Sequence, residues 1–84
     1  MTILSRIQGL LRHMSVHWRK LARRLWQALE ALPFEQKTVV VLREVDGLSY
    51  DDIAFSLNVT LGTVKSRLRR ARQALRAVLQ EPTP

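Results

Sequence analysis

The sequence predicts an all-α fold: a four-helix domain that contains a helix-turn-helix, with an N-terminal amphipathic helical extension. Three observations favour this fold. Apolar residues recur at alternating steps of three and four, which is the spacing of one helix face. Capping and turn residues divide the chain into segments of helical length. The valines at 39–41 would also suit a strand, but the chain has no second strand-like run to pair with them.

The size and composition of the chain limit what it can be. With 84 residues, it can form one compact domain with a thin core, but not two domains. It has no cysteine, which excludes a disulfide framework and a thiolate metal site and favours a reducing cytoplasm. Because no run of about 18 apolar residues occurs, no membrane span is predicted.

The first part of the chain is predicted to be an amphipathic helix, interrupted near Gly9 or Ser15. Its apolar residues share one helix face: Leu4, Ile7, Leu11, Met14, Trp18, Leu21, Leu25, Ala28 and Leu32. Pro33 ends this helix, because proline pushes the residue before it into extended backbone. We divide the chain into a basic extension over residues 1–20 and a domain over residues 21–80.

Three interpretations of this N-terminal segment stay open. In the one we favour, residues 18–32 form the first core helix, with Trp26 in the core, and residues 1–17 fold back or fray. In the others, the basic amphipathic segment binds a partner or a second copy, or it docks on an anionic membrane surface. His13 and His17 have a spacing that can hold a metal, but no carboxylate or thiol lies nearby, so no metal or other cofactor is predicted.

Residues 33–45 are predicted to form the second helix. Three of its apolar residues are expected to face inward: Val39, Leu42 and Val45. Proline suits the first helical turn, and the pair Asp46-Gly47 ends the helix.

The third predicted helix is short and covers about residues 50–57. Ser49, with Asp52 three residues later, approximates a capping box at its start. Its expected core residues are Ile53, Ala54 and Leu57. Asn58 tolerates the left-handed conformation that ends a helix, and Thr60 can cap the next one. A helix, a three-residue turn and a further helix make up a helix-turn-helix, whose second helix enters the major groove of DNA.

The last helix is predicted over residues 61–79, with two unlike faces. Its apolar face consists of Val64, Leu68, Ala71, Leu75 and Val78. The opposite face carries hydrogen-bond donors and no acid: Gly62, Thr63, Lys65, Ser66, Arg69, Arg70 and Gln73, with Arg67 and Arg72 at the borders. Cations that flank a groove bind DNA phosphates favourably because counterions are released, and base edges offer acceptors to long donor side chains. A merely solvated basic helix would interleave acids with its cations, and this one has no acid over residues 61–80.

Charge is divided into three zones along the chain. Residues 1–29 carry six cations and no acid, residues 30–60 carry six acids and two cations, and residues 61–80 carry six cations and no acid. The formal net charge of +7 favours polyanionic partners, either nucleic acid or an anionic membrane. No constellation of nucleophile, base and phosphate loop is present, so an enzyme is not predicted.

Residues 31–75, ALPFEQKTVVVLREVDGLSYDDIAFSLNVTLGTVKSRLRRARQAL, resemble region 4 of bacterial sigma factors, most closely the extracytoplasmic-function (ECF) group. The resemblance rests on Leu32-Pro33 with Gln36, on the run LREV followed by GLSY, on Ile53-Ala54, and on GTVKSR followed by RAR. A response-regulator effector domain shares a Gly-Leu-Ser stretch and a Thr-Val-Lys helix, but its helix normally continues differently.

The resemblance implies that the domain reads the −35 element of promoters and helps to recruit RNA polymerase. Carried over by position, Lys65, Ser66, Arg69 and Arg70 would face bases, and Arg43, Thr63, Arg67 and Arg72 would hold phosphates. Thr60 completes the predicted DNA-binding set. The implied partners are double-stranded promoter DNA, the beta flap of the polymerase core and an anti-sigma factor, in the bacterial cytoplasm at the nucleoid. The acidic middle zone and the apolar faces of residues 21–45 are candidates for the protein contacts.

Three departures from the family pattern shape these expectations. No region 2 is present in the sequence, so we expect either an excised C-terminal domain or a stand-alone relative, not a working initiation factor by itself. Asn58 stands where the family often has glycine, and residues 1–20 do not resemble the usual interdomain linker. The alternative function is an interaction protein that uses the same fold to bind polymerase or an anti-sigma factor without acting through DNA.

Overall fold

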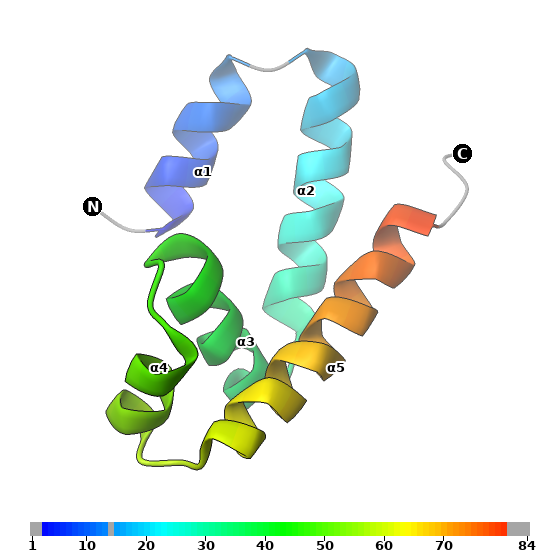
Figure 1. Cartoon of the computed structure of the whole chain (residues 1–84). Coiled ribbons are helices and arrows are strands. Elements are labelled where there is room, and N and C mark those ends of the chain that lie inside the picture. The colour runs from blue at the N-terminus through cyan, green and yellow to red at the C-terminus, as the bar shows by residue number, and fades with distance from the viewer. Residues whose placement is uncertain (1–2, 14, 81–84) are drawn as a thin grey trace.

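The computed structural model describes residues 3–13 and 15–80, and in them every regular element is helical. The elements are α1 (Ile3–Arg12), α2 (Val16–Ala31), α3 (Phe34–Val40), the π-helical turn η1 (Val41–Val45), α4 (Tyr50–Leu57) and α5 (Leu61–Gln80) (Figure 1). The predicted all-α fold is confirmed. Helices α2, α3 and α4 each contact α5, which crosses the molecule and holds the domain together.

The N-terminal segment forms two helices that arch over one side of the molecule (Figure 1). The break between them lies at Ser15, one of the two predicted positions, where the Ser15 side chain accepts a hydrogen bond from the Trp18 backbone N–H at 3.5 Å. The guanidinium of Arg19 donates to the carbonyl of Arg12 at 3.0 Å, which satisfies an open carbonyl at the end of α1. The predicted boundary between residues 20 and 21 falls inside α2, and this division stays a prediction.

Helix α2 contains no buried residue. Its last turns lead into Leu32, which is buried, and Arg24 donates to the carbonyl of Val78 near the end of α5 at 3.3 Å. The prediction that Trp26 lies in the core is wrong, because its side chain is only half-buried and stands outside the core cluster. Helix α2 packs mainly against α5, so one side of it is covered and the rest faces solvent.

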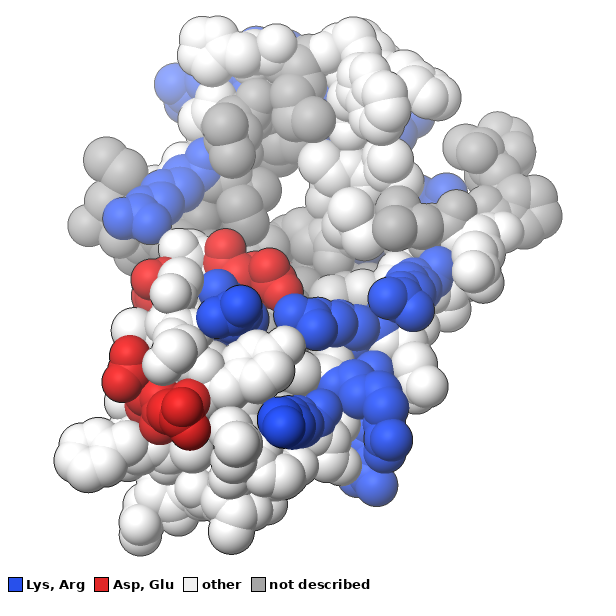
Figure 2. Space-filling view, in the orientation of Figure 1, with Lys and Arg blue, Asp and Glu red and all other residues white. Residues whose placement is uncertain are grey.

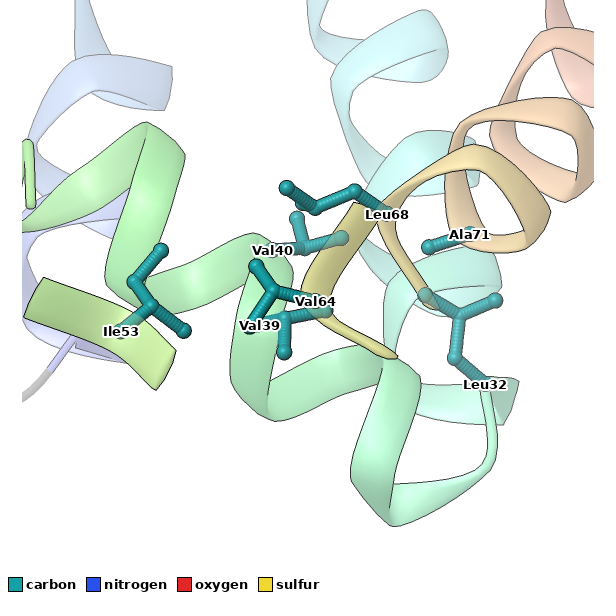
Figure 3. Packing of buried hydrophobic residues seen from close by; sticks show 7 residues of the cluster. All are labelled: Leu32, Val39, Val40, Ile53, Val64, Leu68 and Ala71. Atoms are coloured by element: carbon teal, nitrogen blue, oxygen red, sulfur yellow. The ribbon is translucent and has the colours of Figure 1, made fainter. Parts of the chain in front are cut away.

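The core is built where α3, α4 and α5 meet the end of α2 (Figure 3). Its buried members are Leu32, Val39, Val40, Ile53, Val64, Leu68 and Ala71. Burying a Val, Leu or Ile side chain fully contributes about 1.5–3 kcal/mol relative to leaving it exposed. These few residues therefore fix how α5 sits against the two preceding helices.

The second predicted helix continues through residue 45, but its last turn has π-helical hydrogen bonds. The backbone N–H of Asp46 donates to the carbonyl of Val41 at 3.1 Å, a spacing of five residues. This wider turn shifts the phase of the residues after Val40. The prediction that Val45 faces inward is therefore wrong: it is 38% exposed, whereas Val40 is buried.

The turn between α4 and α5 has the expected conformation. Asn58 lies in the left-handed region, with φ 55° and ψ 47°. The N–H of Val59 donates to the carbonyl of Ala54 at 3.0 Å, a bond that closes the end of α4. At the helix starts, Ser49 accepts from the N–H of Asp52 at 3.1 Å, and Thr60 accepts from the N–H of Thr63 at 3.1 Å. Local hydrogen bonds thus fix where α4 begins and ends and where α5 begins.

Candidate nucleic-acid interface

Helix α5 has a buried back and a cationic front. Val64, Leu68 and Ala71 are buried in the core, as predicted (Figure 3). On the opposite side, Lys65, Arg69 and Arg70 are exposed, and within the described part of the chain none of them has an ion-pair partner. Three unpaired cations within six residues of one helix repel each other, and a polyanion in contact with them would relieve that repulsion.

The two arginines at the borders of this face are paired with acids from earlier elements. Arg67 Nη2 lies 3.8 Å from Glu35 Oε2 of α3, and Arg72 Nη2 lies 2.7 Å from Glu44 Oε1 of η1. Arg72 also donates to the hydroxyl of Tyr50 at 3.5 Å. The hydrogen bond to Glu44 first, and then that to Tyr50, raise the pKa of Arg72. The short pair fixes Arg72, whereas the long pair leaves Arg67 weakly held.

Arg43 is held against the loop that precedes α4. Its guanidinium donates to the carbonyl of Leu48 at 2.9 Å and lies 4.8 Å from the ring centroid of Tyr50. A contact of this kind contributes about 0.5–1 kcal/mol at an exposed site. Tyr50 therefore lies between two arginines, Arg43 on its ring and Arg72 on its hydroxyl, and it joins the loop to α5. The phosphate-binding role expected for Arg43 stays a prediction.

An open groove of about 550 Å³ runs between the start of α3 and the start of α5. Its lining is mostly polar and comprises Pro33, Glu35, Gln36, Thr60, Gly62, Thr63, Ser66, Arg67 and Arg70. Inside it, the hydroxyls of Thr60 and Thr63 are 2.9 Å apart and hydrogen-bonded to each other. Five predicted site residues thus line this groove: Thr60, Thr63, Ser66, Arg67 and Arg70.

The remaining predicted site residues lie outside this groove. Lys65 and Arg69 project from the exposed side of α5, and Arg43 and Arg72 stand together around Tyr50. Glu35 and Gln36 of α3 were not among the predicted site residues. No local signal in the sequence identifies them, because their place beside α5 depends on how α3 packs across that helix.

Acids and cations occupy neighbouring regions of the surface. Figure 2 shows cations spread across the face that α5 presents, and acids gathered beside them toward α4. The acids of this region are Glu44, Asp46, Asp51 and Asp52. Among the residues described, no group of three His, Cys, Asp or Glu side chains is placed to hold a metal ion. No helix in the described ranges is long and apolar enough to cross a membrane.

Comparison with known proteins gives consistent matches. The family model described as sigma-70, region 4 matches residues 22–75. The ECF RNA polymerase sigma factor SigE of Mycolicibacterium smegmatis is 48% identical over 63 residues, which cover 75% of this chain and 24% of that protein. The RNA polymerase sigma-H factor of Pseudomonas aeruginosa is 46% identical over 54 residues, or 64% of this chain and 28% of that protein.

The ECF RNA polymerase sigma-E factor of Escherichia coli K12 is also similar. It is 43% identical over 51 residues, which cover 61% of this chain and 27% of that protein. The chain thus spans about a quarter of the length of the curated relatives it matches.

Proposed function

The chain belongs to the sigma-70 region 4 family, and on that premise we propose that its helix-turn-helix reads the −35 element of bacterial promoters as the DNA-binding module of an ECF-type sigma factor. The observation that carries the proposal is the two-sided α5. Its apolar residues Val64 and Leu68 are buried, while Lys65, Arg69 and Arg70 are exposed and have no ion-pair partner in the part of the chain that the structure describes. The proposed role is binding, and no catalytic step is part of it.

The proposed roles of the individual residues follow from their place on α5. Lys65, Arg69 and Arg70 are long donors on the exposed face, which suits contacts with the acceptor edges of guanine in the major groove. Ser66 is short, half-buried and faces the groove beside α3, where it allows the helix to approach the bases closely. The phosphate contacts are assigned to residues at the borders and flanks of this face: Arg43, Thr60, Thr63, Arg67 and Arg72.

Protein contacts form the second part of the proposal. We propose that RNA polymerase, through its beta flap, and an anti-sigma factor bind the acidic and apolar surfaces rather than the face of α5. Two exposed aromatic residues favour a protein contact: Phe34 is 78% exposed and Phe55 is 90% exposed. Large exposed aromatic side chains are enriched at protein interfaces. The proposed place of action is the bacterial cytoplasm, at the nucleoid.

The competing function is an interaction protein that binds polymerase or an anti-sigma factor without acting through DNA. Titration of labelled duplexes that contain or lack candidate −35 sequences separates the two functions. Arg69→Ala or Arg70→Ala should weaken binding by about 1–3 kcal/mol and relax base preference. Arg72→Ala should weaken all sequences alike and reduce the salt slope by about 1.

The matched control is Arg23→Ala, which removes one exposed cation from α2. It should change affinity much less than the α5 variants do, because Arg23 lies outside the helix-turn-helix. If Arg69→Ala, Arg70→Ala and Arg72→Ala all leave DNA affinity unchanged while binding to the polymerase flap persists, the interaction protein is the correct reading.

A further inference from the structure

The groove beside α5 contains one acid among cations and hydroxyls. Glu35 stands on the first turn of α3, and its carboxylate lies 3.8 Å from the guanidinium of Arg67. The rest of the lining offers the donors that a phosphate group takes: Arg67, Arg70 and the hydroxyls of Thr63 and Ser66. The carboxylate is therefore the one lining group that opposes a phosphate in a groove otherwise suited to one.

The ion pair between Glu35 and Arg67 is weak enough for Arg67 to exchange the carboxylate for another anion. The Glu35 side chain is 70% exposed, and the distance to Arg67 is longer than that of a good charge-assisted hydrogen bond. Exposed ion pairs of this kind contribute little to folding, so replacing one anionic partner of Arg67 by another costs the domain little. Arg67 itself is only 24% exposed, which keeps its guanidinium at the groove whichever anion it binds.

The pair between Glu44 and Arg72 provides the contrast. Its atoms are 2.7 Å apart, and Arg72 has a further partner in the hydroxyl of Tyr50. An incoming phosphate would have to compete with both partners. Of the two arginines that border the face of α5, Arg67 is thus the one that can change its partner readily.

We propose that Glu35 sets the affinity of α5 for DNA by occupying, in the free protein, the position at Arg67 that a backbone phosphate takes in the complex. This inference rests on the proposed function. When DNA binds, the phosphate replaces the carboxylate at Arg67, and Glu35 is left beside a like charge at the edge of the groove. Because phosphates are the same at every base pair, Glu35 weakens binding to all sequences equally. It therefore lowers the occupancy of promoter and non-promoter DNA alike.

The test compares Glu35→Gln with Glu30→Gln in the full chain. Glu30 is an exposed acid on α2 with no partner recorded within the described residues, so its variant measures the effect of simply losing one negative charge. The probe is a random-sequence DNA duplex, titrated by fluorescence anisotropy at several salt concentrations. Glu35→Gln should tighten binding about two- to fivefold, the range that corresponds to an exposed ion pair. This gain should shrink as salt is added, because salt screens the repulsion between Glu35 and the phosphate. Glu30→Gln should tighten it less than about twofold, since its charge is screened.

A second pair of variants shows whether Glu35 acts through Arg67. Arg67→Met keeps an unbranched stem in the half-buried site and removes the charge. In the Arg67→Met background, Glu35→Gln should increase the affinity for DNA no more than Glu30→Gln does. Thermal melts recorded by circular dichroism should show that all four variants are folded at the temperature of the titration.

Three results contradict these expectations, and they differ in what they overturn. Equal gains from Glu35→Gln and Glu30→Gln, or a gain from Glu35→Gln that survives in Arg67→Met, overturn the role of Glu35 and leave the proposed function standing. A wild-type chain that binds no duplex at low salt overturns the proposed function and this inference with it.

Discussion

Replacing Arg72 with alanine removes the side chain that connects α5 to η1 and α4. Its guanidinium binds Glu44 of η1 at 2.7 Å and reaches the hydroxyl of Tyr50, the first residue of α4, at 3.5 Å. The side chains of Arg72 and Glu44 are 41% and 55% exposed, so solvent screens their attraction. The bond to Tyr50 is at the upper limit of hydrogen-bond length and adds little.

From this geometry we expect Arg72→Ala to lower the free energy of unfolding by about 1 kcal/mol. Most of it comes from the pair with Glu44, for which exposed pairs suggest about 0.2–1 kcal/mol, and the rest from the apolar stem of the arginine. In a domain of this size, 1 kcal/mol corresponds to a fall in Tm of about 4–8 °C. A thermal melt of the full chain, followed by circular dichroism, measures this shift.

A double-mutant cycle with Glu44→Gln isolates the pair. We expect a coupling energy of about 0.5–1 kcal/mol that decreases as salt is added. Arg76→Ala is the matched control, because Arg76 is an exposed arginine of the same helix without a recorded partner in the described ranges; its effect should stay within about 0.5 kcal/mol. A coupling energy of zero, or equal losses from Arg72→Ala and Arg76→Ala, would refute the view that Arg72 is fixed by Glu44.

The pH dependence of this pair has a definite sign. The pKa of Arg72 is raised by its hydrogen bonds to Glu44 and Tyr50. A base whose pKa is raised by folding contributes its full stabilisation below its unfolded pKa and loses it only as the pH rises through the folded value. The stabilisation by the Arg72 cation should therefore stay constant across the neutral range and be lost as the pH rises to strongly alkaline values.

Three further predictions concern the core, the turn and the exposed aromatic surface. Leu68→Ala removes a buried side chain and should cost about 2–5 kcal/mol, a large part of the stability of a small domain, which a urea melt would show as a much lower midpoint. Asn58→Ala should cost about 1 kcal/mol, because alanine lacks the short polar side chain that lets asparagine adopt the left-handed backbone. Asn58→Gly should be nearly neutral, because glycine adopts this backbone freely; equal effects of the two would contradict this reasoning. Phe55→Ser should change stability by less than about 0.5 kcal/mol, because the side chain is exposed. If Phe55 contacts a protein partner, the same variant should weaken binding to an isolated polymerase flap fragment, measured by titration.

The helix-turn-helix could be predicted because its determinants are local. Ser49, Asn58 and Thr60 cap or end helices through bonds to residues at most five positions away, and such bonds can be read from neighbouring letters of the sequence. The buried face of α5 followed from the spacing of Val64 and Leu68 for the same reason.

Other features depend on tertiary packing and could not be predicted. Val45 was expected inside because a regular helix was assumed, and the π-helical turn over Val41–Val45 changes its direction. Trp26 was expected inside because residues 18–32 were expected to form a core helix, and the sequence does not tell how much of that helix a neighbour covers. Glu35 lies about thirty residues from Arg67 in sequence, and only the crossing of α3 and α5 brings the two together.

The sorting of charge on the surface has a consequence before any contact is made. With cations across α5 and acids toward α4, the domain carries a permanent electrical asymmetry as well as a net charge (Figure 2). In the electric field of a long anion such as DNA, the domain experiences a torque that turns α5 toward the anion while the two are still nanometres apart. Fewer collisions are then wasted on the wrong side of the domain, and this advantage fades as mobile ions shorten the range of the field.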